Sequence, residues 1–320
     1  MTDMAEPSRA AMPALPLAPA VGIIAALGVL AAAPLFVSQY GLSVALNLFM
    51  TVALAESWLI LSGLTGYVSL GHAVFFGLGA YIMAVCFDSA PFWAVIPLGG
   101  IASALLALVL GFPALRVRGP YFVILTFGLA ELVKFVVVTI ESAVGNFGRI
   151  LMNVPDIAVL YELMLGLAAV AFVLVAVVQR SRFGAALRAI REDESAAETI
   201  GINVRSAKVA AFVLSAIIPG MVGAVMAMRS AYFEPMVAFS PMVSFTIVTT
   251  AMIGGSDTPM GPLLGALLLV GASELLWSHA PEIYNILLGI VLVVFVLRVP
   301  EGLYGRAVAW LGHRKRRRAP

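Results

Sequence analysis

The stretch "PFWAVIPLGGIASALLALVLG", residues 91–111, contains no charged side chain. A span of a lipid bilayer needs about 20 apolar residues, so this run has the length of one crossing. Backbone groups in hydrocarbon must be hydrogen-bonded within the chain, which makes a helix the natural structure for it. We therefore expect residues 91–111 to form a membrane helix.

Runs of the same kind recur along the whole chain. They predict an all-α, polytopic integral membrane protein with about ten transmembrane or half-membrane helices. The expected spans are residues 20–37, 42–61, 70–87, 91–111, 120–140, 157–178, 209–229, 238–255, 261–278 and 283–298.

The composition agrees with a membrane protein. Of the 320 residues, 62% are hydrophobic and 11% are charged, and the mean hydropathy is +1.05. Soluble domains carry about a quarter charged residues, so a soluble fold is excluded. The single cysteine, Cys86, leaves no intrachain disulfide.

We expect three regions: a cytoplasmic N-terminal leader (1–19), a transmembrane domain (20–298) and a basic cytoplasmic tail (299–320). The first apolar run is interpreted as an uncleaved span, because a signal peptide has a shorter apolar core and a cleavage site. The tail sequence "RKRRR" (314–318) is expected to fix the membrane topology and to contact anionic lipid rather than to bind nucleic acid.

Lys and Arg residues predict the orientation, because they concentrate in cytoplasmic loops. With the N-terminus inside, the outer loops hold only Arg149, with Arg229 at the end of a span. An even number of spans then places both termini in the cytoplasm. The basic residues on the inside would be Arg116, Arg118, Arg180, Arg182, Arg188, Arg191, Arg205, Lys208, Arg306 and Arg314 to Arg318.

One loop, residues 179–208, is far longer and more polar than the others. Loops above about 12–15 residues usually have a function or are disordered. Helical spacing places four small or apolar residues near one face: Leu187, Ile190, Ala197 and Ile200.

The motif from Ser195 to Glu198 matches a capping box, and Gly201 suits a helix stop. We expect a short helix near 195–200, or two short helices that meet near Asp193. The loop is either a solvated connection or a docking helix for a cytoplasmic partner.

Four sequence blocks resemble the permeases of branched-chain amino-acid ABC transporters, of the LivM type. They are "GYVSLGHAVFFGLGAY" (66–81), "LRVRGPYFVILTFGLAELVKFVV" (115–137), "GAALRAIREDESAAETIGINVRSAKVAAFVLSA" (184–216) and "MIGGSDTPMGPLLGALL" (252–268). The third block is similar to the Glu-Ala-Ala type of loop that fits a groove in the ATPase subunit. Asp257 departs from the family, which usually has glycine in that turn.

The resemblance implies a subunit of an ATP-driven importer in the bacterial inner membrane. Its partners would be two ABC ATPase subunits, a second permease of the LivH type, a periplasmic substrate-binding protein and membrane lipid. Asp193, Glu194 and Ala197 are expected to contact the ATPase. The full expected coupling set is Arg191, Glu192, Asp193, Glu194, Ala197 and Gly201.

The energy source is expected on another chain. A Walker A loop ends in Gly-Lys followed by Ser or Thr, and none of the lysines, Lys134, Lys208 and Lys315, stands in that context. ATP and Mg would therefore bind partner subunits, and this chain would hold no cofactor or metal.

The motifs HExxH and GxSxG are also absent, which argues against a membrane enzyme. The alternative is a proton-coupled secondary transporter of small polar solutes. The sequence does not name the cargo, since similar permeases import branched-chain or other amino acids, amides or urea.

Ionisable residues inside spans are functional candidates because burying a charge in lipid is costly. Four such residues stand out: Glu56, Glu131, Lys134 and Glu274. Glu131 and Lys134 are three residues apart and are expected to form a structural pair more readily than a proton relay. Glu56 and Glu274 could bond a neighbouring helix, reach an interface or line a polar path.

The segment 63–81 is interpreted as a broken segment that faces the permease core, because irregular backbone at this depth needs protein or a wet cavity around it. Gly66 and Ser69 suit a turn, and Gly79 suits close helix packing. His72 is expected to be satisfied by backbone or water, with a gate or cargo contact as the alternative.

Hydroxyls of the span 238–255 either bond to their own helix or line a route for a zwitterion. The expected path residues are Gly66, Ser69, Gly71, His72, Phe75, Gly79, Thr246 and Thr250.

Overall fold

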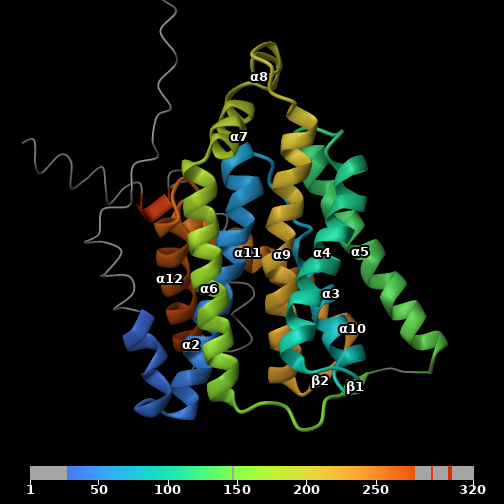
Figure 1. The fold of residues 1–320 in the computed structure, drawn as a ribbon, viewed down its shortest axis with the longest axis vertical. Coiled ribbons are helices and arrows are strands. Elements are labelled where there is room, and N and C mark those ends of the chain that lie inside the picture. Colours follow the sequence, from blue (N-terminus) through green and yellow to red (C-terminus); the bar gives the residue numbers. More distant parts are fainter. Residues whose placement is uncertain (1–26, 146–147, 278–289, 291–301, 305–320) are drawn as a thin grey trace, which may run out of the picture. The chain divides into compact units, whose positions relative to one another are not determined.

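The computed structural model describes residues 27–145, 148–277, 290 and 302–304. Within these residues the secondary structure is helical apart from two short strands, β1 and β2 (Figure 1). Six helices are long and apolar enough to cross a membrane, by length and composition, and two apolar helices are shorter. The predicted all-α polytopic fold is therefore confirmed.

The first elements cover the chain up to the long loop. They are η1 (Ala33–Leu35), α2 (Gln39–Trp58), its π-helical continuation η2 (Leu59–Gly63), α3 (His72–Cys86), α4 (Phe92–Ala114), α5 (Pro120–Ala143), β1 (Arg149–Ile150) and α6 (Ile157–Arg180). The loop and the remaining chain contain α7 (Arg182–Glu192), α8 (Glu194–Thr199), α9 (Val204–Ser230), β2 (Tyr232–Phe233), α10 (Pro235–Ala238), α11 (Pro241–Gly254) and α12 (Met260–Trp277).

Most expected spans have a matching helix, and one requires correction. The span expected at 238–255 corresponds to α11, which begins at Pro241 behind the cap Ser240. The run expected at 20–37 is not one helix in its described part. Residues 27–31 are helical, then a turn and η1 follow at Pro34, a residue that cannot donate to a helix ladder. Residues 20–26 and nearly all of the expected span 283–298 lie outside the described residues.

Helix α9 lies against both α3 and α4, and α2 lies against α6 (Figure 1). Between helices in lipid, small residues allow close backbone contact. A Cβ atom built on Gly79 of α3 would lie 1.8 Å from the carbonyl oxygen of Gly220 in α9. The role expected for Gly79 in helix packing is therefore confirmed.

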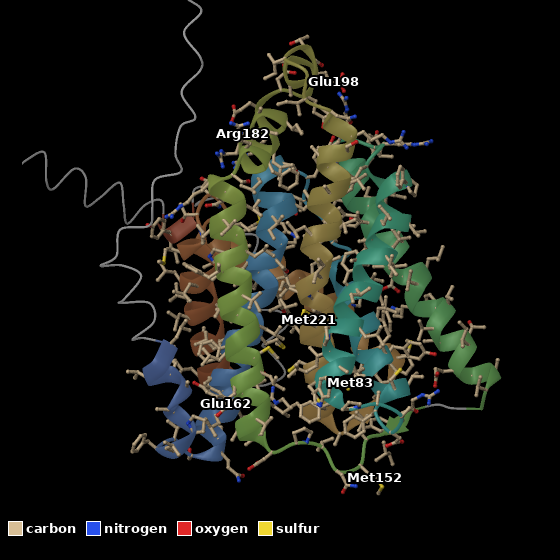
Figure 2. The ribbon with its side chains drawn as sticks, viewed as in Figure 1. Met83, Met152, Glu162, Arg182, Glu198 and Met221 are labelled. Carbon is tan, nitrogen blue, oxygen red and sulfur yellow. The ribbon has the colours of Figure 1, made fainter. Side chains whose placement is uncertain are left out.

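The two ends of the helical unit that begins at Gln39 carry different elements, two short helices at one and two short strands at the other. Helices α7 and α8 stand at one end, where Arg182 and Glu198 lie, and Met152 lies at the other (Figures 1 and 2). At that other end β1 pairs with β2 in antiparallel register, Arg149 opposite Phe233. Arg149 also forms an ion pair of 2.9 Å with Glu141 at the end of α5.

Candidate functional site

The helical structure is interrupted between η2 and α3, as expected for a broken segment. Residues 66–71 connect the helical turn at the end of η2 to the start of α3. Gly66 has φ of 76°, in the region that favours glycine, so the expected turn at this residue is confirmed.

Side chains from neighbouring helices satisfy the donors of this segment. The N–H of Leu70 donates to Thr126 Oγ1 of α5 at 3.2 Å, and the N–H of Ala73 donates to Ser244 Oγ of α11 at 2.9 Å. Without such partners, each buried amide would cost free energy comparable to a lost hydrogen bond. The segment is thus held by α5 and α11 as well as by its own ends.

Ser69 serves the same purpose within the segment. Its N–H donates to Ser62 Oγ at 3.2 Å, its carbonyl accepts from Trp58 Nε1 at 2.9 Å, and its hydroxyl accepts from the N–H of Gly71 at 3.2 Å. The turn role expected for Ser69 is therefore supported by direct hydrogen bonds.

His72 begins α3 and is fully buried, and neither ring nitrogen has a hydrogen-bond partner among the described residues. Of the two expected partners, backbone or water, the backbone is therefore ruled out within the described part of the chain, and a water partner stays a prediction. The ring stands edge-on to Phe75, with centroids 5.9 Å apart, and Phe75 packs against Phe212 of α9. Aromatic packing, and not a backbone acceptor, fixes its position.

Helices α7 and α8 meet at Asp193, as one of the two sequence interpretations has it. Asp193 Oδ1 accepts from the N–H groups of Ser195 at 2.7 Å and Ala196 at 3.0 Å, so Asp193 is the N-cap of α8. The predicted capping box from Ser195 to Glu198 is wrong, because the helix already begins at Glu194. Gly201, with φ of 85°, ends it as expected.

The apolar face predicted for this loop is only partly present. Leu187, Ile190 and Ala197 are buried against the chain itself, whereas Ile200 is 73% exposed. Ile200 lies past the last residue of α8, where the backbone has left the helix, and this explains the difference. Ala197 thus has no open surface in the chain alone, and Ile200 does.

Arg191 of α7 joins three segments. Its Nη1 donates to the carbonyl oxygen of Gly63, at the end of η2, at 2.9 Å, and to Asp257 Oδ1, in the turn between α11 and α12, also at 2.9 Å. We call this the Arg191 bridge. Asp257, the residue that departs from the expected family pattern, is therefore a partner of α7.

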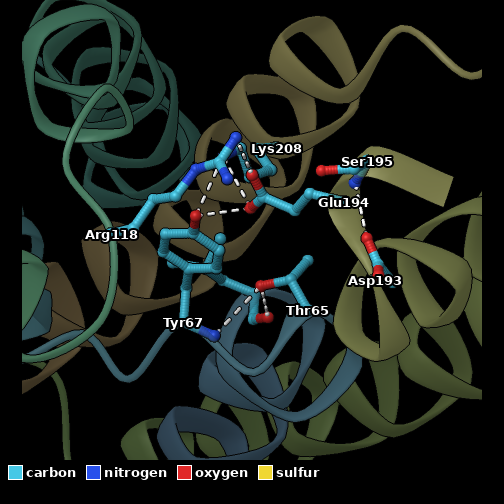
Figure 3. A network of polar contacts seen from close by, with 8 residues as sticks. Thr65, Tyr67, Arg118, Asp193, Glu194, Ser195 and Lys208 are labelled. Carbon is cyan, nitrogen blue, oxygen red and sulfur yellow. Dashed lines mark hydrogen bonds and ion pairs between the residues drawn. The ribbon is translucent and has the colours of Figure 1, made fainter. Parts of the chain in front are cut away.

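Glu194 of α8 is the centre of a second group of contacts (Figure 3). Tyr67 of the broken segment donates its hydroxyl hydrogen to Glu194, and Lys208 Nζ lies 2.9 Å from Glu194 and 3.0 Å from the Tyr67 hydroxyl oxygen. Arg118, in the loop between α4 and α5, pairs with the other carboxylate oxygen at 2.8 Å. We call these four residues the Glu194 cluster.

Most of this cluster is shielded from water. The side chains of Lys208 and Glu194 are 5% and 10% exposed, whereas that of Arg118 is 64% exposed. Burial alone would raise the pKa of the Glu194 carboxyl, but hydrogen bonds from Tyr67 and Lys208 outweigh it and hold that pKa below its ordinary value. Burial and the bond to Glu194 raise the pKa of the Tyr67 hydroxyl, which stays a donor at neutral pH.

A cavity of about 550 Å³ lies beside both groups of contacts. Its walls are residues 65–68 of the broken segment, residues 118–120 and 123 around the start of α5, and residues 190–195 where α7 meets α8. Glu192 lines it with Arg191 and Glu194. The broken segment and the two short helices therefore share one water-accessible space.

The ionisable residues of the spans have different surroundings. Glu131 and Lys134 form the expected pair within α5. Glu274 accepts from the Tyr40 hydroxyl, which selects the bond to a neighbouring helix among its open alternatives. Glu56 is fully buried, and neither carboxyl oxygen has a partner among the described residues.

Of the two expected fates for the hydroxyls of α11, the structure shows the bond to the own helix at Thr250, which donates to the carbonyl oxygen of Thr246 at 2.7 Å. Ser244 takes neither fate, because its hydroxyl oxygen accepts from the N–H of Ala73 in α3. Thr249 is buried and its hydroxyl has no partner among the described residues. Roles for Thr246 and Thr250 in a cargo path stay predictions.

Sequence reasoning did not place Tyr67, Arg118, Lys208 or Asp257 at the site. Arg118 and Lys208 appeared only as topology signals, and Tyr67 had no motif of its own. A single sequence gives no sign that residues 127 positions apart, such as Tyr67 and Glu194, are in contact.

A family model described as "Branched-chain amino acid transport system / permease component" matches residues 40–296. The chain belongs to this permease family. The match covers α2 to α12, including the broken segment, the Arg191 bridge and the Glu194 cluster. The predicted LivM-type identity is confirmed by the relatives of this permease.

Two of these relatives are the high-affinity branched-chain amino acid transport system permease proteins LivM of Salmonella typhimurium and Escherichia coli. They are 27% and 28% identical to the permease, over 85% of its chain and 72% of theirs. The LivH protein of Salmonella typhimurium is 29% identical over 40% of this chain and 42% of its own. No solved structure is significantly similar to the permease.

Proposed function

We propose that this permease is a membrane subunit of an ATP-driven importer of branched-chain or related amino acids, and that α7 and α8 bind a separate ATPase subunit. The observation that carries the proposal is the pair of short polar helices at one end of a membrane-spanning unit whose family transports amino acids. The names of the LivM and LivH relatives support the cargo class and a second permease subunit.

The distribution of charge supports a cytoplasmic position for the α7–α8 end. Five basic residues lie in or beside the two short helices: Arg180, Arg182, Arg188, Arg191 and Lys208. Positive residues concentrate in cytoplasmic loops. The bacterial inner membrane is the proposed location, with both termini inside.

Ile200 is the residue best placed to contact the ATPase. It is a large apolar side chain, 73% exposed, at the end of α8. Apolar anchors that enter a pocket supply much of the free energy of protein contacts. Charge on this residue is therefore expected to weaken docking without disturbing the buried face of α8.

The experiment is co-purification of the tagged permease from membranes of its own organism in a mild detergent. We expect an ABC ATPase, a LivH-type permease and, with cargo, a substrate-binding protein in the complex, and leucine uptake that requires ATP. Ile200→Glu should lose the ATPase but keep wild-type insertion. Met152→Glu is the matched control, because Met152 is 71% exposed and lies at the opposite end (Figure 2). A wild-type complex without a nucleotide hydrolase would refute the proposal.

A further inference from the structure

We infer that Arg191 and Glu194 are positioning residues that connect movement of α7 and α8 to the broken segment between α2 and α3. This inference rests on the proposed function, since it concerns how docking of an ATPase reaches the transport path. It assigns the connection to two particular contacts, the Arg191 bridge and the Glu194 cluster, and not to the apolar packing of the loop.

The Arg191 bridge acts on two turns at once. The carbonyl group of Gly63 is at the end of η2, where a helix leaves acceptors without partners inside the helix. The guanidinium fills this need from α7, and it also holds Asp257 between α11 and α12. A shift of α7 therefore acts directly on the end of η2 and on the turn before α12.

The Glu194 cluster acts on the other side of the same segment. Tyr67 follows Gly63 by four residues and is bound to Glu194 and Lys208. Because Lys208 is almost fully buried, it depends on Glu194 for its counter-charge, and breaking such a pair is strongly unfavourable. The contact is therefore kept when α8 moves, and Tyr67 follows it.

The broken segment borders a cavity, and it is bonded to two membrane helices that its movement would affect. The cavity of about 550 Å³ borders residues 65–68, so these residues can shift without pushing into a packed core. Beyond Tyr67 the segment is bonded to α5 through Leu70 and to α11 through Ala73. His72, buried and without a hydrogen-bond partner among the described residues, lies between those two anchors in the chain.

The test measures leucine transported per ATP hydrolysed by the complete importer, purified with its partners and reconstituted into vesicles. Arg191→Gln removes the guanidinium of the Arg191 bridge, and Glu194→Gln removes the negative charge that pairs with Lys208 and Arg118. We expect both variants to retain the ATPase in wild-type amount, while transport per ATP falls at least about fivefold, the lower range of energetic coupling between sites. A merely structural residue would change yield and thermal stability but not this ratio.

Controls on the same helices separate the effect from general loss of charge. Arg188→Gln removes a cation from α7 that bonds the carbonyl of Gln179, and Glu198→Gln removes an exposed anion from α8. Neither should change transport per ATP. If Glu194→Gln fails to fold, Tyr67→Phe is the second variant. It removes one hydroxyl but keeps the ion pair between Lys208 and Glu194 and the contact of the residue 67 ring with Phe122. It should also lower transport per ATP.

The double variant Glu194→Lys with Lys208→Glu exchanges the two charges and is the rescue experiment. Its transport per ATP should be higher than that of Glu194→Lys alone or of Lys208→Glu alone. An unchanged ratio in Arg191→Gln and Glu194→Gln would overturn the inference. Loss of the ATPase from these variants would also overturn it, because the residues would then serve docking. A wild-type complex with no ATPase would overturn the proposed function itself, and the inference with it.

Discussion

Replacement of Gly79 by alanine tests the packing of α3 on α9. The added Cβ atom would lie 1.8 Å from the carbonyl oxygen of Gly220, whereas ordinary contact begins at 3.4 Å. The two backbones must therefore part by about 1.6 Å. The atom in the way is backbone and cannot rotate aside, so we expect the upper range of overpacking penalties, about 3 kcal/mol.

Thermal unfolding of the purified permease in detergent, followed by tryptophan fluorescence, measures this penalty. A loss of about 3 kcal/mol should lower Tm by roughly 6–12 °C. Gly166→Ala in α6 is the matched control, because no atom of the part of the chain that the structure describes lies within 4 Å of its added Cβ. Alanine is favoured over glycine in a helix, so the control should hold or raise Tm. If Gly79→Ala unfolded at the same temperature as the control, the close approach of α3 and α9 would be refuted.

Three further substitutions test the ion and hydrogen-bond contacts. Glu56→Met should raise the unfolding temperature, because Glu56 has no partner among the described residues and a buried carboxyl without one costs about 1–3 kcal/mol; a lower Tm would show that Glu56 has a partner. Asp193→Ala should cost about 1 kcal/mol through loss of the α8 cap, and limited proteolysis near residues 193–200 should speed up. Glu194→Gln should lower Tm at neutral pH. Because the folded pKa of Glu194 is depressed, its contribution is present above the ordinary value of 4.5 and is lost as pH falls through the folded pKa. The Tm difference from wild type should therefore shrink only below that value, and a difference that changed near pH 7 would contradict the assignment.

The helices were predictable because membrane burial acts on local sequence. The run 91–111 became α4, Phe92–Ala114, since every apolar residue in it favours the same environment. Local chemistry was less decisive at the start of α8. Both Asp193 and Ser195 are good caps, and only the backbone, extended at Asp193, shows which one the chain uses.

The contacts that define the candidate site were not predictable from the sequence alone. Glu194 finds Tyr67, Arg118 and Lys208 only after four separate elements come together. Charged side chains in loops look alike whether they will be exposed or buried in pairs. The burial of Lys208, which makes its ion pair important, depends wholly on tertiary structure.

The position of Cys86 has a practical consequence. It is the single thiol of the chain, half-buried at the last residue of α3, the helix whose first residue is His72. A maleimide or spin label can thus be attached at one defined point of the native protein, with no background cysteine to remove. The labelling rate with and without nucleotide would report displacement of this helix directly, and a membrane-impermeant reagent would reveal which side of the bilayer the thiol faces.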